Sequence, residues 1–244
     1  MFSIIKESQL YIEYVIVVDG AVGSDLREIL EQIRDLEKVS ILELTVNVGL
    51  AKALNYGLEK MKSDIVIRMD SDDIAMRDRL RTSYDEYIAR GEDVLGFGVS
   101  RFCSKSDLQK PITSGSSRSI LFGFLFSSPL NHPTVVFKRE VVLQVGGYPD
   151  VYRREDSALW LQLKASGYNI AVSKTRTLYF RQCENDIERR IGWKYSLSEL
   201  MLFKYKVRAF PSLILILIPL TLALFLLRNI PKRLFNIIYQ LAKS

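Results

Sequence analysis

The chain of 244 residues has few of the side chains from which stapled folds and zinc sites are built. It contains two cysteines, Cys103 and Cys183, and a single histidine, His132. Two cysteines so far apart exclude a disulfide-rich scaffold and give no metal-site spacing. We expect two inert, buried thiols in a reducing cytosol. The first residues also lack the pattern of a signal peptide, so we expect the body of the protein to face the cytosol.

Acidic residues are missing from the last part of the chain. From Met201 onward there are seven Lys and Arg and no Asp or Glu, so this tail carries +7. Because the whole chain carries +6, residues 1–200 carry −1. The basic character belongs to the tail, where it surrounds an apolar segment, and we therefore expect no nucleic-acid partner.

No apolar run reaches the ~20 residues that a membrane-spanning helix needs. The run from Leu213 to Leu227 comes nearest, and an amphipathic pattern follows from Ile230 to Leu241. Apolar segments with basic flanks favour helices that lie on an anionic inner leaflet. A buried core helix or a dimer contact is the alternative interpretation.

The rest of the chain alternates between strand and helix patterns. We expect strands at 14–18, 41–45, 64–69, 94–102 and 134–137, and helices at 25–36, 50–61, 76–90 and 155–165. This alternation predicts an α/β fold with a Rossmann-like, mostly parallel sheet and helices on both faces.

Three carboxylates, Asp70, Asp72 and Asp73, follow the apolar run that ends at Met69. The carboxyl end of a strand is where open α/β sheets bind ligands. Carboxylates this close repel one another, and Mg²⁺ or Mn²⁺ among them would relieve the repulsion and hold a diphosphate. The alternative is that residues 71–73 merely cap the next helix.

Several short motifs continue this pattern in a fixed order along the chain. They are Asp19-Gly20, NVGLAKALNYG at 47–57, RMDSDD at 68–73, RDRL at 77–80, NHPT at 131–134, Gly147-Tyr148, and Glu155-Asp156 followed by Leu159-Trp160. The ordered set resembles family 2 glycosyltransferases of the GT-A fold, especially bacterial enzymes of O-antigen, capsule and exopolysaccharide assembly. The resemblance implies inverting sugar transfer from a nucleotide sugar such as a UDP-sugar. It also implies a polyprenyl-diphosphate-linked glycan acceptor and a Mn²⁺ or Mg²⁺ ion.

The resemblance also assigns donor-binding residues. Asp19 matches the acid that contacts the nucleotide base, and Asn47, Gly49 and Asn55 belong to the segment beneath the nucleotide. Arg68 and Asp70 belong to the motif that faces the diphosphate. Asp19 could instead be only a turn residue before its glycine, and the small residues of 47–57 could serve helix–sheet packing.

Metal binding and catalysis are assigned in the same way. Asp72 matches the metal ligand, Asp70 is the first acid of the same motif, and His132 lies where some relatives place a histidine near the metal. Asp156 matches the general base that deprotonates the acceptor hydroxyl, with Glu155 beside it. The alternatives are a structural histidine and a Glu-Asp pair that only caps its helix.

The chain departs from the family pattern at its start. The usual first strand is missing, and residues 2–9 resemble the end of the first helix. We expect residues 1–103 to bind the nucleotide sugar, 104–200 to bind the acceptor, and 201–244 to form C-terminal membrane-associated helices at the cytoplasmic face of the cell membrane. Two alternatives stay open: an inactive homologue that serves as a membrane-bound assembly subunit, and transfer to polyprenyl phosphate.

Overall fold

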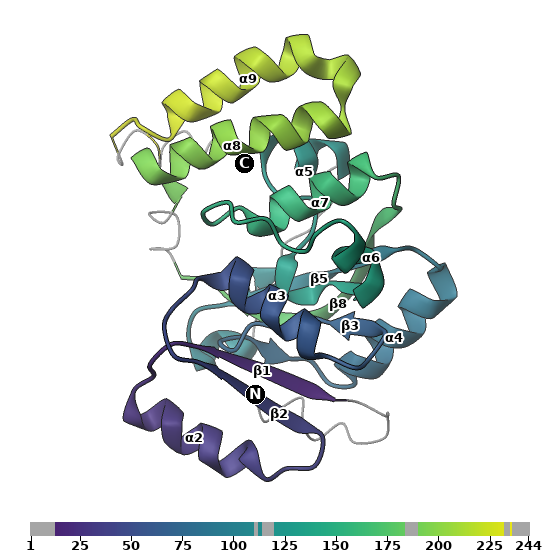
Figure 1. Ribbon diagram of the computed structural model, residues 1–244, viewed down its shortest axis with the longest axis vertical. Coiled ribbons are helices and arrows are strands. Elements are labelled where there is room, and N and C mark those ends of the chain that lie inside the picture. Colours follow the sequence, from purple (N-terminus) through teal and green to yellow (C-terminus); the bar gives the residue numbers. More distant parts are fainter. Residues whose placement is uncertain (1–12, 110–111, 114–119, 184–189, 232–234, 236–244) are drawn as a thin grey trace.

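The computed structural model describes residues 13–109, 112–113, 120–183, 190–231 and 235. Three levels follow one another from bottom to top in Figure 1: a small sheet with a helix on each side, a larger mixed sheet, and a pair of long helices. Residues 2–9, where the departure from the family pattern was noted, lie outside the described part, and so does most of the amphipathic pattern at 230–241.

The lower level is a two-stranded parallel sheet with a helix on each side. Its elements are β1 (Tyr14–Asp19), α2 (Ser24–Arg34), β2 (Val39–Leu44) and α3 (Leu50–Lys60). Leu30 and Ile33 of α2 are buried against Val18 of β1. On the other side α3 approaches closely, because a Cβ added at Gly57 would lie 3.0 Å from the Val17 side chain.

The larger sheet forms the middle of the molecule. Its strands are β3 (Ile65–Ile67), β4 (Ile74–Ala75), β5 (Val94–Phe102), β6 (Ile112–Thr113), β7 (Val136–Lys138) and β8 (Ile170–Arg181), in the order β3-β7-β5-β8-β4 with β6 beside β5. The α/β class is confirmed, but the expectation of mostly parallel strands is wrong for this sheet. Only β5 and β8 pair in parallel, and the other described pairs are antiparallel.

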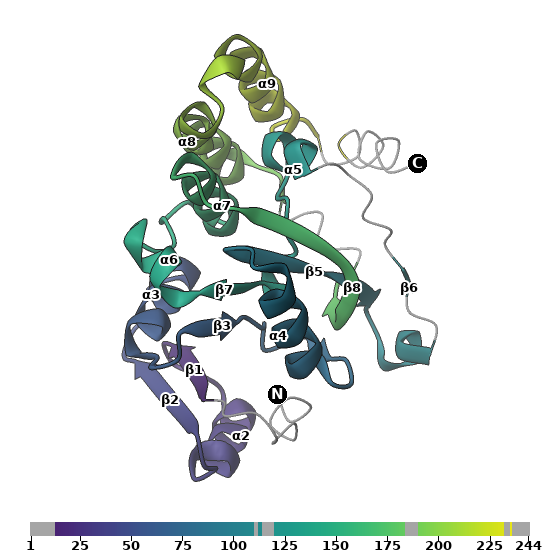
Figure 2. The same cartoon turned by 90° about the vertical axis from the view of Figure 1, so that its right-hand side faces the viewer.

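The remaining helices cover this sheet and build the upper level. They are α4 (Arg79–Arg90), α5 (Ile120–Phe126), α6 (Arg139–Gln144), α7 (Glu155–Ala165), α8 (Trp193–Ala209) and α9 (Ile214–Leu227). Helix α7 lies between the sheet and α8 (Figures 1 and 2). Leu159, Trp160 and Leu163 of α7 are fully buried, as the sequence predicted. Helix α4 starts three residues later than expected, because Asp78 just before it has a left-handed backbone with a φ of +57°.

A disulfide joins Cys103 to Cys183 across a sequence separation of 80. The prediction of two inert, buried thiols is therefore wrong, and Cys103 is exposed. The parallel pairing of β5 with β8 places Phe102 opposite Arg181, so the two cysteines follow neighbouring strand ends. This pairing is a long-range contact that the local sequence does not reveal.

The helical pair α8–α9 has a large exposed apolar surface. Its exposed apolar side chains are Trp193, Leu197, Leu200, Met201, Ile214, Leu215, Ile216, Ile218, Leu222 and Leu226. Across the residues that the structure describes, no helix combines the length and the apolar character needed to cross a bilayer.

Candidate functional site

Asp70, Asp72 and Asp73 form a compact group at the turn after β3. Each residue offers one carboxylate oxygen, and these oxygens lie within 4.8 Å of one another. The side chains differ in exposure: Asp72 is exposed, Asp70 is half-buried and Asp73 is buried. The outermost carboxylate therefore faces solvent, while the other two sit behind it.

Arg68 holds Asp70 in a two-pronged ion pair. Its Nη1 donates to Oδ2 of Asp70 at 3.0 Å, and its Nη2 contacts Oδ1. Burial raises the pKa of Asp70, and the Arg68 guanidinium opposes that rise. Arg79 supports the turn from beneath, donating from Nη2 to the carbonyl oxygens of Arg68 and Pro133 at 2.7 Å each.

Asp73 is held by β8 and keeps one oxygen without a hydrogen bond. The backbone N–H of Arg181 donates to Oδ1 of Asp73 at 2.8 Å, whereas the buried Oδ2 has no hydrogen-bond partner. Burial, together with the charges of Asp70 and Asp72, raises the pKa of Asp73 to about 7. Oxygen donors crowded together, one of them unsatisfied, fit a hard divalent cation such as Mg²⁺ or Mn²⁺.

Asp19 ends β1 and fixes the loop before α3. Its two carboxylate oxygens accept the N–H groups of Val48 at 2.7 Å and Gly49 at 2.9 Å. The Asn47 side chain donates to the Asp19 carbonyl at 3.1 Å, and Gly49 has a φ of +90°. The structure thus brings Asp19, Asn47 and Gly49 together, with the Asp19 carboxylate engaged by backbone.

Asn55 ties α3 to the turn before α7. Its amide donates to the Tyr148 carbonyl at 2.9 Å, and its Oδ1 accepts the Tyr148 N–H at 2.7 Å. Gly147 must be a glycine here, because it has a φ of +75° and an added Cβ would lie 2.4 Å from Asn55 Oδ1. Both polar ends of the Asn55 side chain are therefore used within the protein.

His132 is held by aromatic neighbours. Its Nε2 lies 3.1 Å from the Tyr148 hydroxyl, and its ring meets Trp160 edge-on. Burial lowers the pKa of His132 well below its usual value, so the ring is neutral near pH 7. Among the described residues, the group that could hold a metal ion comprises the three aspartates without His132.

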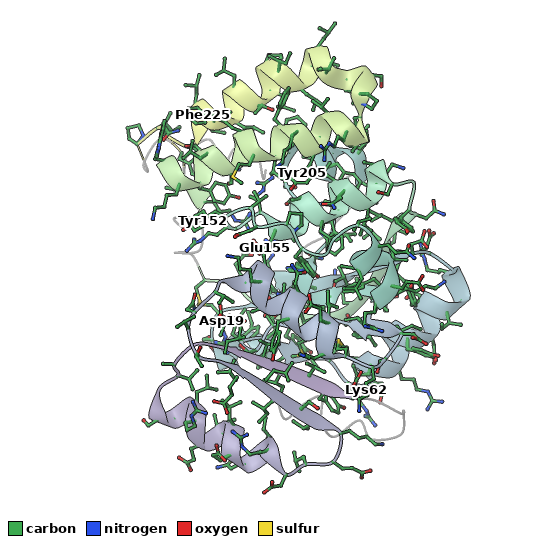
Figure 3. The ribbon with its side chains drawn as sticks, in the orientation of Figure 1. Asp19, Lys62, Tyr152, Glu155, Tyr205 and Phe225 are labelled. Carbon is green, nitrogen blue, oxygen red and sulfur yellow. A yellow bond between two sulfur atoms is a disulfide. The ribbon has the colours of Figure 1, made fainter. Side chains whose placement is uncertain are left out.

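Glu155 and Asp156 form the first turn of α7. Figure 3 places Glu155 between the α8–α9 pair above it and the end of β1 that carries Asp19 below it. Burial and the neighbouring Asp156 charge raise the pKa of Glu155 to about 7. The Ser157 hydroxyl donates to Oδ1 of Asp156 at 3.2 Å.

One cleft of about 660 Å³ connects the acids of the two halves of the chain. Asp70, Asp72 and Asp156 all line it. The predicted metal ligands and the predicted base therefore share one cavity, although more than 80 residues separate them in sequence.

Sequence reasoning missed the basic side of this cleft. Its further lining includes Arg153, Arg154, Arg181, Arg190 and Arg228. Arg228 is one of the basic residues of the tail beyond Met201, but it is only 8% exposed. The sequence signal for a buried Arg228 is Glu199, the last acid before the basic tail. In the structure Glu199 lies 3.7 Å from the Arg228 guanidinium.

Comparisons with known proteins agree with this arrangement. A family model described as glycosyl transferase family 2 matches residues 2–142. The chain is 34% identical over 200 residues to a UDP-Gal:alpha-D-GlcNAc-diphosphoundecaprenol beta-1,3-galactosyltransferase of Escherichia coli, covering 81% of this chain and 73% of that protein. It is 31% identical over 196 residues to the amylovoran biosynthesis glycosyltransferase AmsE of Erwinia amylovora, covering 80% and 74%.

Solved structures share the fold at lower identity. S. aureus TarS in complex with UDP-GlcNAc matches with a TM-score of 0.61 and 17% identity, over 80% of this chain and 57% of that chain. A mannosyltransferase from Pyrobaculum calidifontis in complex with GDP-Man and Mn²⁺ matches with a TM-score of 0.51 and 21% identity, over 83% and 55%. With a family model over more than half of its length and relatives above 30% identity, the chain belongs to glycosyl transferase family 2 and is a glycosyltransferase with the GT-A fold.

Proposed function

We propose that the protein transfers a sugar from a UDP-sugar, with inversion at the anomeric carbon, to a glycan on a polyprenyl diphosphate in cell-surface polysaccharide synthesis. One observation carries the proposal: Asp70, Asp72 and Asp156 line a single cleft. The substrates are those in the name of the Escherichia coli relative, which uses UDP-Gal and a GlcNAc-diphosphoundecaprenol acceptor.

Asp72 and Asp70 would hold the Mn²⁺ or Mg²⁺ ion. When bound, the ion supplies positive charge that stabilises the departing diphosphate. Arg68 orients the Asp70 carboxylate toward this role through its two-pronged contact. His132 stays the weaker candidate ligand, since its Nε2 already lies at hydrogen-bond distance from Tyr148.

Asp156 would act as the general base. Its carboxylate accepts the proton of the acceptor hydroxyl, and the acceptor oxygen forms a bond to the anomeric carbon. The bond from that carbon to the diphosphate oxygen breaks, and its electron pair leaves with the nucleoside diphosphate. Attack from the face opposite the leaving group inverts the configuration. Glu155, with its pKa near 7, would hold the acceptor or adjust the charge on Asp156.

The donor nucleotide would lie over the loop that Asp19 organises. Asn47 and Gly49 present this loop at the end of β1, and Asp19 sets its shape by accepting two of its N–H groups. Asn55 would act indirectly, by positioning the turn at Tyr148.

The exposed apolar face of α8 and α9 would rest on the inner leaflet that carries the acceptor. Leu215, Ile218 and Leu222 lie on one side of α9 and are more than half exposed. Burying them in the interfacial region is favourable, at about 25 cal/mol for each Å² of apolar surface. Leu215→Asp together with Leu222→Asp should abolish co-flotation with lipid vesicles. Unchanged flotation would contradict this placement.

The transfer reaction is tested with matched carboxylate variants. Asp72→Asn and Asp156→Asn should each reduce transfer of radiolabelled sugar at least 100-fold, since each removes a charge from the reaction centre. Asp85→Asn, an exposed site on α4, is the control and should keep full activity. Circular dichroism would verify the fold of all three variants. Full activity in either cleft variant would refute the assigned roles.

A further inference from the structure

The cleft is lined by side chains of both charges. We call Asp70, Asp72 and Asp156, with the Arg181 that contacts the aspartate turn, its acidic end, and the arginines from three other segments its basic end. These arginines are Arg153 and Arg154 before α7, Arg190 before α8, and Arg228 after α9. The mechanism proposed above assigns no role to the arginines of the basic end.

Glu199 is the buried counter-ion of the basic end. Its Oε1 lies 3.1 Å from Arg154 Nη1 and 3.7 Å from Arg228 Nη2, and its Oε2 lies 3.8 Å from Lys206 Nζ. One carboxylate thus serves three buried cations, which leaves the group with an excess of positive charge. This excess favours an anion in the adjoining cleft.

Arg228 lines the cleft and keeps an unsatisfied hydrogen-bond donor. Its guanidinium lies 5.1 Å from the centre of the Tyr195 ring, and its buried Nε has no hydrogen-bond partner in the described structure. The Gly192 N–H donates to the Arg228 carbonyl at 2.8 Å, which fixes the end of α9 against the start of α8. The side chain is therefore held at the wall of the cleft with donor capacity left.

Arg190 completes the basic end at the surface. It is exposed, lines the same cleft and makes no ion pair with any described residue. Burial is the main cause that lowers the pKa of Arg228, and the charges of Arg154 and Arg190 lower it further, as expected for like charges near one another. An anion between Arg190 and Arg228 would relieve this repulsion, and arginine pairs suit phosphate oxygens because the guanidinium donates two parallel hydrogen bonds.

The basic end adjoins the exposed apolar face. Trp193 follows Arg190 by three residues, is 62% exposed and packs edge-on against Phe225 of α9 at 5.4 Å. Figure 3 shows Phe225 on the same side of the molecule as Tyr152, just before α7, and Glu155. An anion bound here lies between the reaction centre and the apolar helices, the position required for a phosphate that links a sugar to a lipid.

We propose that Arg190 and Arg228 form the subsite for the diphosphate of the lipid-linked acceptor, holding its sugar toward Asp156 in the same cleft. This assignment rests on the proposed function. It makes the arginines positioning residues for the acceptor and leaves the donor diphosphate to the acidic end.

The test compares acceptors with and without the diphosphate. The variant is Arg190→Gln, since Arg190 is exposed and its loss leaves the Glu199 group intact; the matched control is Arg208→Gln, an exposed arginine at the far end of α8. Losing one charge-assisted hydrogen bond should raise the KM for an alkyl-diphosphate-linked acceptor roughly tenfold or more. The KM for the donor should stay the same, Arg208→Gln should match wild type, and Arg190→Lys should recover part of the loss.

An equal loss on the same acceptor sugar carried by a phosphate-free alkyl glycoside would overturn the subsite. A raised donor KM would also overturn it, because the arginine would then serve the nucleotide diphosphate. Binding of the diphosphate-linked acceptor without donor or metal gives a second readout, and wild type should bind roughly tenfold more tightly than Arg190→Gln. Equal binding would contradict the subsite.

Binding to vesicles of anionic phospholipid distinguishes a diphosphate subsite from a general electrostatic contact with the membrane. Wild type and Arg190→Gln should bind them alike, and a matching loss there would refute a diphosphate subsite. Failure of wild type to turn over any donor would count against the proposed function alone, since the acceptor-binding measurement would still decide the subsite.

Discussion

Glu199→Gln should be among the most damaging single changes in the upper part of the molecule. Glu199 is fully buried and is the shared counter-charge of Arg154, Lys206 and Arg228. The amide keeps the shape of the side chain but removes its charge. Three buried cations would then face one another without a carboxylate.

The size of the effect follows from the burial of the cluster. Breaking a buried ion pair by removing one partner costs about 3–5 kcal/mol, because the remaining charge stays desolvated and unpaired. A domain of this size has about 5–15 kcal/mol of stability in total. The variant should therefore be marginally folded at 25 °C, and transfer activity should fall because Arg154 directly precedes the turn that carries Asp156.

Urea unfolding followed by circular dichroism measures the loss, and a second variant separates charge from shape. Burial lowers the pKa of Lys206 to about 8, so this cation is the least costly to remove. Adding Lys206→Met to Glu199→Gln should restore about 1–2 kcal/mol of the lost free energy of unfolding, because one unpaired buried charge is removed. Lys204→Met, an exposed neighbour, should restore nothing. A loss below about 1 kcal/mol in Glu199→Gln would refute the reasoning.

Three further predictions concern pH, backbone and the disulfide. Because the pKa of Glu155 is raised from 4.5 to about 7, its contribution to stability is full below pH 4.5 and is lost as the pH rises through 7. Without metal, the free energy of unfolding of Glu155→Gln in urea should therefore equal that of wild type at pH 4.5 and exceed it by at most about 3 kcal/mol at pH 8. Equal free energies of the two proteins at both pH values would contradict the raised pKa of Glu155. Gly147→Ala should destabilise by more than Gly146→Ala in thermal unfolding, since both have positive φ but only the former collides with Asn55, and equal losses would exclude the collision. Cys103→Ser should lower the free energy of unfolding by about 2–4 kcal/mol in non-reducing buffer and leave it unchanged in dithiothreitol. A loss of stability in both buffers would show that packing, and not the disulfide, is responsible.

Local patterns predicted much of the fold correctly. β5 was predicted with its observed bounds, and α7 was predicted with its buried face, because a strand run and a helical period are properties of neighbouring residues. The direction of the strands was not predictable, since it depends on the pairing of β5 with β7 and β8, which come from distant parts of the chain. The disulfide was missed for the same reason.

The candidate site shows the same division. The acids were recognised because a strand end followed by carboxylates is a local signal, and the structure brings Asp72 and Asp156 into one cleft. The basic tail was misjudged in part, because Lys206 and Arg228 are buried with Glu199 and do not face a membrane. Charge counting along the sequence cannot distinguish a solvated cation from one that is paired across two helices.

The most direct test of the metal-centred mechanism is crystallography of the protein with UDP and Mn²⁺, using anomalous scattering to locate the ion. We predict a manganese peak about 2.0–2.3 Å from a carboxylate oxygen of Asp72 and in contact with the diphosphate, in the cleft that Asp156 also lines. A peak elsewhere, or UDP bound outside this cleft, would contradict it.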